Sequence, residues 1–87
     1  MAYKIEFRPA APRDLKALPR EILQRVSEKI SALAENPRPV GVEKLSGSEE
    51  DFCRIRIGDY RVLHTIQDHV LLILIIKVRH RREAYRG

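Results

Sequence analysis

The sequence predicts a small α+β domain, in which a two-helix hairpin packs on one face of a mainly antiparallel sheet. Three observations predict it: an alternating strand pattern near the N-terminus, an apolar stripe at helical spacing in residues 22–34, and two alternating segments around Gly58-Asp59. The expected element order is β-α-α-β-β-β. We assign residues 1–87 to one domain, because a chain of 87 residues buries one core.

The N-terminal part supplies the first strand and a short helix. Residues 3–7 alternate apolar and charged side chains, which is typical of a strand, and Pro9 and Pro12 end it. Residues 13–18 fit a short helix, and Pro19 both stops it and suits the first turn of the next helix.

The second helix has the most regular pattern in the chain. Its apolar residues are spaced by four, four and three positions, which makes one stripe that we assign to the core: Ile22, Val26, Ile30 and Leu33. Asn36-Pro37 ends the helix, because a residue before proline avoids the helical region. In the connection that follows, residues 42–45 fit an extended segment.

The C-terminal part predicts three consecutive strands. Residues 52–57 alternate, and Gly58-Asp59 is a two-residue turn with glycine first, as a type II′ hairpin requires. Residues 60–67 then form the partner strand. Residues 70–78 form the third strand, whose seven consecutive apolar residues indicate an interior position with cover on both faces.

Positive charge is concentrated in the C-terminal part of the chain. The net charge is +5, and residues 1–51 are neutral with nine basic and nine acidic residues. Residues 52–87 hold eight basic residues against three acidic ones. This asymmetry indicates a polyanionic partner, which can be a nucleic acid, an anionic membrane or an acidic protein. The alternative is a basic surface that only water contacts.

Several classes of protein are excluded by what the sequence lacks. No stretch approaches the roughly 20 apolar residues that cross a bilayer, and residues 1–9 do not have the pattern of a secretory signal. The single cysteine, Cys53, has no partner for an internal disulfide, and the three histidines are too scattered for a metal site. We therefore expect no metal, no cofactor and a cytoplasmic location.

The predicted hairpin brings arginines together. With Gly58-Asp59 as the turn, Ile55 faces Val62 on one side of the sheet and Arg56 faces Arg61 on the other. Like charges directly opposite one another destabilise a sheet, so a sequence selected for stability alone would avoid this pair. With Arg54 beside them, these arginines predict an anion site, because a guanidinium binds phosphate oxygens in pairs. A solvated basic face is the alternative.

Further candidates lie near the C-terminus. Basic side chains from the end of the third strand extend the patch and are candidates for contacting RNA: Lys77, Arg79, His80 and Arg82. Histidine is a residue type that can move a proton, which makes His80 a candidate for that role, and Tyr85 offers a ring that stacks on a base. Each can instead hold the end of the chain against the body. His64 falls on the predicted core face and His69 in a turn, so neither is assigned to the site.

These residues resemble a known family. FCRIRIGDYRVLHTIQD and VLLILIIKVRHRREAYR, preceded by KLSG, are similar to the RelE/ParE superfamily of bacterial and archaeal toxins. The stretch from RDLKALP to ENP fits the helical hairpin of the same family, and the resemblance covers essentially the whole chain. It implies the toxin of a type II toxin–antitoxin pair, with a cognate antitoxin as partner.

The resemblance also implies an activity. Toxins of the RelE branch enter the ribosomal decoding site and cut the bound codon without a metal, through attack of the messenger's 2′-hydroxyl on the adjacent phosphate. The family's active positions match Arg54, Arg56, Arg61, Arg81 and Tyr85 of this chain. Arg81 would neutralise or protonate the leaving oxygen.

More than one group can serve as the general base, and the fold is compatible with more than one activity. Relatives often carry lysines where this chain has Arg54 and Arg56, and arginine is too strong a base to shed its proton, so the general base is His80, Tyr85 or no protein group at all. The fold is shared with the ParE branch, which inhibits DNA gyrase, and with non-catalytic nucleic-acid-binding modules. The full set of active positions favours the nuclease.

Overall fold

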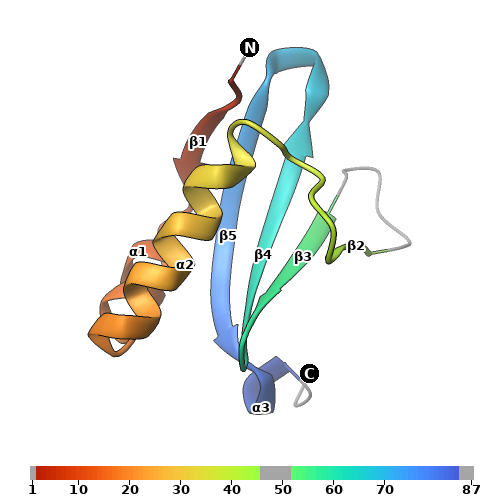
Figure 1. Cartoon of the computed structure of the whole chain (residues 1–87). Helices are drawn as coiled ribbons and strands as arrows, with labels where there is room; N and C mark the ends of the chain where they lie inside the picture. Colours follow the sequence, from red (N-terminus) through yellow and green to blue (C-terminus); the bar gives the residue numbers. More distant parts are fainter. Residues whose placement is uncertain (1, 46–51, 85–87) are drawn as a thin grey trace.

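The structure is a computed structural model that describes residues 2–45 and 52–84. The elements run along the chain as β1 (Lys4–Phe7), α1 (Ala10–Lys16), α2 (Arg20–Leu33), β2 (Val42–Lys44), β3 (Phe52–Ile57), β4 (Tyr60–Gln67), the 3₁₀ turn η1 (Asp68–Val70), β5 (Leu72–His80) and α3 (Arg81–Ala84). Five strands form one sheet in the order β1-β5-β4-β3-β2. All neighbouring pairs are antiparallel except β1 and β5. Figure 1 shows α1 and α2 together on one side of this sheet, which confirms the predicted fold class.

The β3–β4 hairpin has the register that the sequence predicts. Gly58 has a φ of +59°, whereas Asp59 keeps a negative φ, as a type II′ turn requires. Arg56 pairs with Arg61, and Ile55 pairs with Val62. Side chains alternate between the two faces of a sheet. In this register Ile55 and Val62 therefore face the helices, and Arg56 and Arg61 lie on the opposite face.

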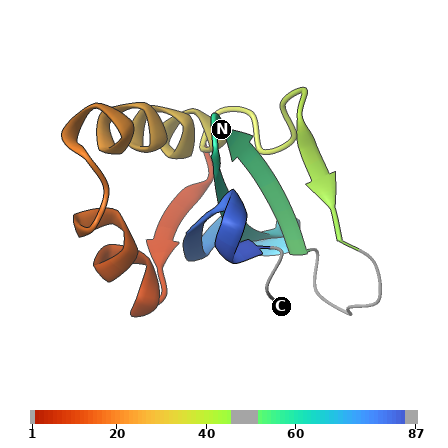
Figure 2. The same ribbon diagram turned by 90° about the horizontal axis from the view of Figure 1, so that it is seen from below.

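The core lies between the helices and one face of the sheet. The stripe on α2 buries Val26, Ile30 and Leu33, which are 0%, 4% and 0% exposed. They pack with inward-facing residues of β3, β4 and β5: Ile55, Ile57, Val62, Ile73, Ile75 and Val78. Figure 2 looks along the sheet from below and shows α2 across one face, with β2 at the far edge from α1.

Helix α1 differs from the sequence prediction. It begins at Ala10 and ends at Lys16, whereas the sequence predicts a helix over residues 13–18. Pro12 therefore lies in the first turn instead of before the helix. Proline is tolerated there because first-turn amides have no partner within the helix. The earlier start brings Ala11, which is fully buried, into the core.

Strand β5 is an interior strand, as predicted, but it begins two residues later than expected. The chain turns through η1 and Leu71, which has a φ of +52°, so Val70 and Leu71 are exposed at 55% and 37%. Leu63 pairs with Lys77, whereas the next residue of β4, His64, pairs with Ile75. Ile76 is thus an extra residue, a β-bulge, in β5.

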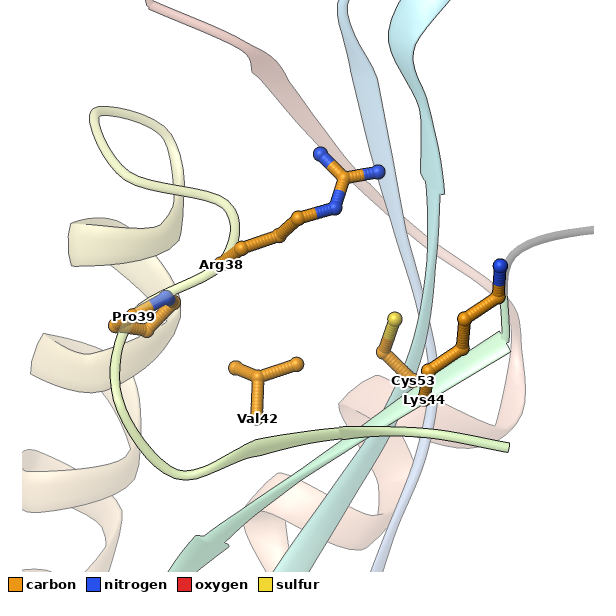
Figure 3. Close-up of a pocket in the computed structure, with 5 residues that line it drawn as sticks. All are labelled: Arg38, Pro39, Val42, Lys44 and Cys53. Atoms are coloured by element: carbon orange, nitrogen blue, oxygen red, sulfur yellow. The ribbon is translucent and has the colours of Figure 1, made fainter. Parts of the chain in front are cut away.

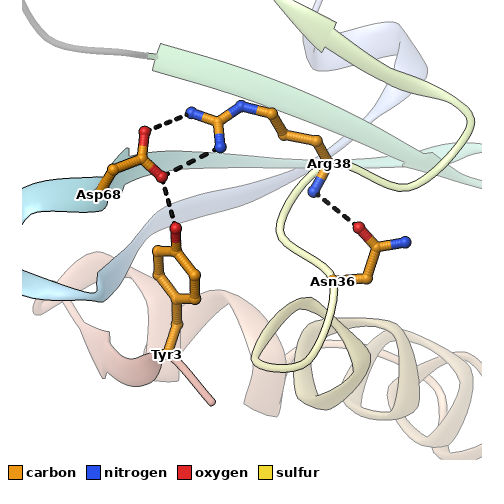
Figure 4. A network of polar contacts seen from close by, with 4 residues as sticks. All are labelled: Tyr3, Asn36, Arg38 and Asp68. Carbon is orange, nitrogen blue, oxygen red and sulfur yellow. Dashed lines mark hydrogen bonds and ion pairs between the residues drawn. The ribbon is translucent and has the colours of Figure 1, made fainter. Parts of the chain in front are cut away.

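A polar cluster fixes the segment between α2 and β2. The two guanidinium nitrogens of Arg38 donate to the two Asp68 carboxylate oxygens at 3.1 and 2.8 Å, and the Tyr3 hydroxyl donates to Asp68 at 2.5 Å (Figure 4). The Arg38 amide also donates to the Asn36 side chain at 3.3 Å. Residues from the N-terminus, the α2–β2 segment and the β4–β5 turn therefore meet at one carboxylate.

This cluster predicts an acid-dependent contribution to stability. Hydrogen bonds from Arg38 and Tyr3 lower the pKa of Asp68 to about 2 from an ordinary 3.8. Because the folded-state pKa lies below the unfolded-state pKa, the contribution is complete above about pH 5 and decreases from there to about pH 2. We expect Asp68→Asn to lower the melting temperature at pH 7 and to lose this difference from wild type near pH 2. A difference that does not change with pH would contradict the assignment; thermal melts of both proteins across this range measure it.

Candidate active site

Three arginines lie in a row across three strands. Arg56 on β3 pairs with Arg61 on β4, and Arg61 pairs with Arg79 on β5. Arg61, at the centre, is only 8% exposed. Placing like charges opposite one another is unfavourable, and the desolvation of Arg61 adds to this cost. The arrangement is therefore not explained by the stability of the fold alone.

Two of these arginines line a groove with Arg54. The arginine groove, which has a volume of about 470 Å³, is lined by Gly41, Val42, Glu43, Arg54, Arg56 and Arg61. The three guanidinium side chains come from the middle strands of the sheet, and β2 forms the opposite wall. A concave surface lined by several fixed positive charges favours anions, and phosphate above all.

Glu43 also lines the arginine groove, and the sequence pattern alone does not predict it there. It pairs with Arg54 in the β2–β3 register, and its carboxylate accepts a hydrogen bond from the Arg54 guanidinium at 2.5 Å. This hydrogen bond, together with the charges of Arg54, Arg56 and Arg61, lowers the pKa of Glu43. The carboxylate is therefore ionised at neutral pH. The signal in the sequence was the extended segment 42–45, which can place Glu43 beside Arg54 if it pairs with β3.

Arg79 points away from the groove. Its guanidinium donates to the Asp14 carboxylate of α1 at 2.6 Å, and the same oxygen accepts the Val78 amide at 2.9 Å. The β1–β5 pairing ends at Ile75, so Asp14 takes the place of a strand partner for the next part of β5. Arg79 thus joins α1 to the sheet, and it is not among the residues that line the arginine groove.

The other predicted residues lie around the end of β5. Arg81 begins α3 beside the hairpin turn, where its amide donates to the Asp59 carbonyl at 2.6 Å and its exposed guanidinium lies 3.8 Å from the Asp59 carboxylate. The His80 ring contacts Tyr60 edge to face at 5.1 Å between centroids, and its Nδ1 accepts the Arg82 amide. Lys77, partly exposed, pairs with Leu63 on the groove side of the sheet. Tyr85 lies outside the described residues.

A separate, smaller hollow lies on the helix side of β2 and β3. Figure 3 shows Arg38 above it, with the Val42 methyl groups and the Cys53 sulfur facing inward. Its volume is about 200 Å³, and it is lined by Arg38, Pro39, Val42, Lys44 and Cys53. No carboxylate or histidine is among these lining residues, so the hollow offers no acid–base pair.

His64 is a core residue, as predicted. It is fully buried beside the β5 bulge, and burial lowers its pKa, so the ring is neutral at pH 7. In the part of the chain that the structure describes, no three side chains of histidine, cysteine, aspartate or glutamate come together to hold a metal ion.

Comparison with known proteins identifies the family. A profile described as "ParE toxin of type II toxin-antitoxin system, parDE" matches residues 5–85. The chain is also 34% identical over 90 residues to the putative toxin RelE1 of Methanocaldococcus jannaschii, a match that covers 100% of this chain and 99% of the relative. The chain belongs to the RelE/ParE superfamily of type II toxins.

The toxin is also similar to two further proteins that carry the name RelE. The crystal structure of the archaeal RelE-RelB complex from Pyrococcus horikoshii contains a chain that superposes with a TM-score of 0.83 at 30% identity, covering 93% of this toxin and 97% of that chain. The mRNA interferase toxin RelE of Escherichia coli is 26% identical over 88 residues, covering 98% of this toxin and 92% of the relative. The family named from the sequence is thus confirmed. None of the described helices has the length and apolar character that a membrane span requires.

The opposed arginines of this toxin predict an unusual response to mutation. We expect Arg56→Gln to leave the free energy of unfolding unchanged or to raise it by up to about 1 kcal/mol, because it removes a like-charge neighbour of Arg61. Chemical denaturation measures the change, with Arg20→Gln on the exposed start of α2 as a control for net charge. A loss of more than about 1 kcal/mol would show that Arg56 stabilises the fold.

Proposed function

We propose that this toxin is a ribosome-dependent endoribonuclease that cuts messenger RNA in the decoding site and so inhibits translation. The observation that carries the proposal is the arginine groove, which Arg54, Arg56 and Arg61 line together, with Arg56 and Arg61 directly opposite each other in the sheet. The name of the E. coli relative, mRNA interferase toxin RelE, supports the same activity.

The proposed reaction uses the RNA itself as nucleophile. The 2′-oxygen attacks the adjacent phosphorus and loses its proton, a P–O2′ bond forms, and the P–O5′ bond breaks. The leaving 5′-oxygen takes up a proton. The products are a 2′,3′-cyclic phosphate and a 5′-hydroxyl, with no oxidant, reductant or hydrolytic water consumed.

In this scheme the arginines stabilise charge. Arg61 and Arg56 would bind the phosphate oxygens as negative charge builds on them, which is usually the largest catalytic effect. Arg61 is suited to this because its burial leaves little water to weaken its charge. Arg81, beside the hairpin turn, would stabilise the negative charge on the leaving oxygen, and Tyr85 would stack on the target base.

The proton from the 2′-hydroxyl has one acceptor among the residues that line the groove. Glu43 is ionised, and a phosphate that binds Arg54 would compete with it for the guanidinium. Its lowered pKa makes it a weak base, since general bases work best with a pKa near the operating pH. His80 already contacts Tyr60 and Arg82. Catalysis would therefore depend mainly on charge stabilisation and on the ribosome's alignment of the 2′-oxygen.

We also propose a cognate antitoxin as the toxin's partner. The archaeal relative was crystallised as a RelE-RelB complex. An acidic segment of an antitoxin would satisfy the charges of the arginine groove and thereby block phosphate binding. The proposed mechanism needs neither a metal nor a cofactor.

The first test is cleavage of messenger on ribosomes. We expect the purified toxin to cut messenger bound to translating ribosomes and to leave the same RNA largely intact when it is free, because a site without a strong base needs its substrate held in line. Primer extension maps the cuts, and the cyclic phosphate end identifies the chemistry.

Three results of this test would contradict the proposal. Efficient cutting of free RNA would show that the ribosome is not needed. No cutting, together with inhibition of gyrase, would place the toxin with the ParE branch, and binding to RNA with neither activity would indicate a non-catalytic module.

We expect the toxin to need no metal ion of its own. Toxin treated with EDTA and dialysed should retain its cleavage rate in the ribosome's own magnesium buffer. A lost rate that zinc or manganese restores would show a metal requirement.

Arg61 provides the sharpest test of the groove. We expect Arg61→Gln to reduce the ribosomal cleavage rate by roughly 10²–10³-fold, by analogy with the loss of other donors that stabilise a developing oxyanion. The melting temperature should stay level or rise, because the repulsion from Arg56 is relieved. Arg20→Gln serves as the control and should cut at the parental rate. An unfolded variant, or one that cuts normally, would remove Arg61 from the proposed site.

A further inference from the structure

A second basic hollow lies on the other side of the hairpin from the arginine groove. This hairpin–helix groove, of about 430 Å³, separates α2 from the β3–β4 turn. It is lined by Arg25, Glu28, Lys29, Ala32, Arg56, Ile57 and Gly58. Three of these side chains are cationic and one is acidic, so the groove is net positive. Of its lining residues, only Arg56 takes part in the chemistry proposed above.

The geometry of the turn brings the helix cations to the hairpin. Arg25 and Lys29 are four residues apart, so they lie on one face of α2. Both terminal nitrogens of the Arg25 guanidinium lie 3.8 Å from the point where a Cβ on Gly58 would stand. The Arg25 guanidinium therefore lies directly over the turn, close to the strand end that carries Arg56.

Arg56 joins the two grooves. It lines both of them, and it lies beyond the last β2–β3 pair, which is Val42 with Ile55. In the described residues, no strand covers the edge of β3 from Arg56 to the turn. Cationic side chains are therefore arranged in series from Arg61 and Arg54, past Arg56 at this uncovered edge, to Arg25 and Lys29.

We propose that the hairpin–helix groove binds a second phosphate of the same RNA strand whose scissile phosphate lies in the arginine groove. A single strand repeats its charge at regular intervals, so it matches cationic sites arranged in series and joined by a shared arginine. The identity of the strand rests on the proposed function, whereas the binding of a polynucleotide phosphate rests on the geometry alone. Arg25 and Lys29 would position the strand and would take no part in bond breaking.

Length-dependent binding tests this proposal. The probes are fluorescent 2′-O-methyl oligoribonucleotides, a trinucleotide and a nonanucleotide, which cannot undergo 2′-oxygen attack. The proteins are wild type, the double variant Arg25→Gln/Lys29→Gln, and a control, Arg13→Gln/Arg20→Gln, which removes the same charge from exposed positions of α1 and α2. Anisotropy titrations over a range of salt concentrations give the affinities, and circular dichroism checks that each variant is folded.

We expect wild type to bind the nonanucleotide more tightly than the trinucleotide. The Arg25/Lys29 variant should bind the nonanucleotide at least about tenfold more weakly at low salt. The slope of its log binding constant against log salt concentration should become shallower by about 1, which corresponds to the loss of one to two phosphate contacts to a single strand. Its affinity for the trinucleotide should stay within about twofold of the control's. Equal losses for both lengths, a loss no larger than the control's, or no binding of the nonanucleotide by wild type would overturn the proposal.

Two further measurements separate the possible failures. If the Arg25/Lys29 variant binds both oligonucleotides as wild type does but binds ribosomes more weakly, the groove contacts the ribosome, and the proposal is wrong. Wild-type cleavage on ribosomes is measured in parallel. A length effect without cleavage would contradict the proposed function alone, and cleavage without a length effect would contradict the second phosphate site alone.

Discussion

The two-residue turn at Gly58-Asp59 fixes the register of β3 against β4, and the two faces of the sheet depend on that register. Ile55 and Val62 meet on the side of the helices, and Arg56 and Arg61 meet on the other side. A shift of one residue would exchange these sets, burying the arginines and exposing the core. The positive φ of Gly58 makes the turn possible without steric cost, so one glycine supports both the core and the candidate site.

The candidate site carries a structural cost that the rest of the fold offsets. Arg61 lies between two other arginines and is almost fully buried, whereas Arg54 and Arg79 each have a carboxylate partner, in Glu43 and Asp14. Carboxylates thus pair with the two flanks of the basic patch, and the Arg61 guanidinium lies between them. A site of this kind should be stabilised by any phosphate or carboxylate ligand, because ligands that bind only the folded state stabilise it.

Much of this arrangement could be predicted from the sequence, because it depends on local rules. Alternation and the turn glycine defined the β3–β4 pairing, and helical spacing defined α2. The start of α1 could not be predicted in the same way, because Pro12 is compatible both with ending a strand and with the first turn of a helix. Burial of Ala11 against the sheet decides between these, and that contact joins segments far apart in the chain.

Two contacts of the basic residues could not be predicted from the sequence for the same reason. Glu43 belongs to a strand of three residues, too short for its alternation to be distinguished from a loop. Arg79 shares the alternation of the groove residues, but Asp14, 65 positions away, binds its guanidinium. Neither partner can be identified without knowing how β2 and α1 pack on the sheet. Local pattern therefore predicted which residues share a face, and tertiary contacts determine which of them line the groove.

The bulge at Ile76 has a consequence for how β5 tolerates change. Ile73 and Ile75 point to the core two positions apart, and Val78 follows after three, so the extra residue resets the phase of the strand. Before the bulge, the residues that alternate with the buried isoleucines are apolar. After the bulge, the residues on either side of buried Val78 are basic, Lys77 and Arg79. Loss of a single residue here would invert every side chain on one side of the deletion, whereas a substitution changes only one. Natural variation at this point should therefore keep its length more strictly than its composition.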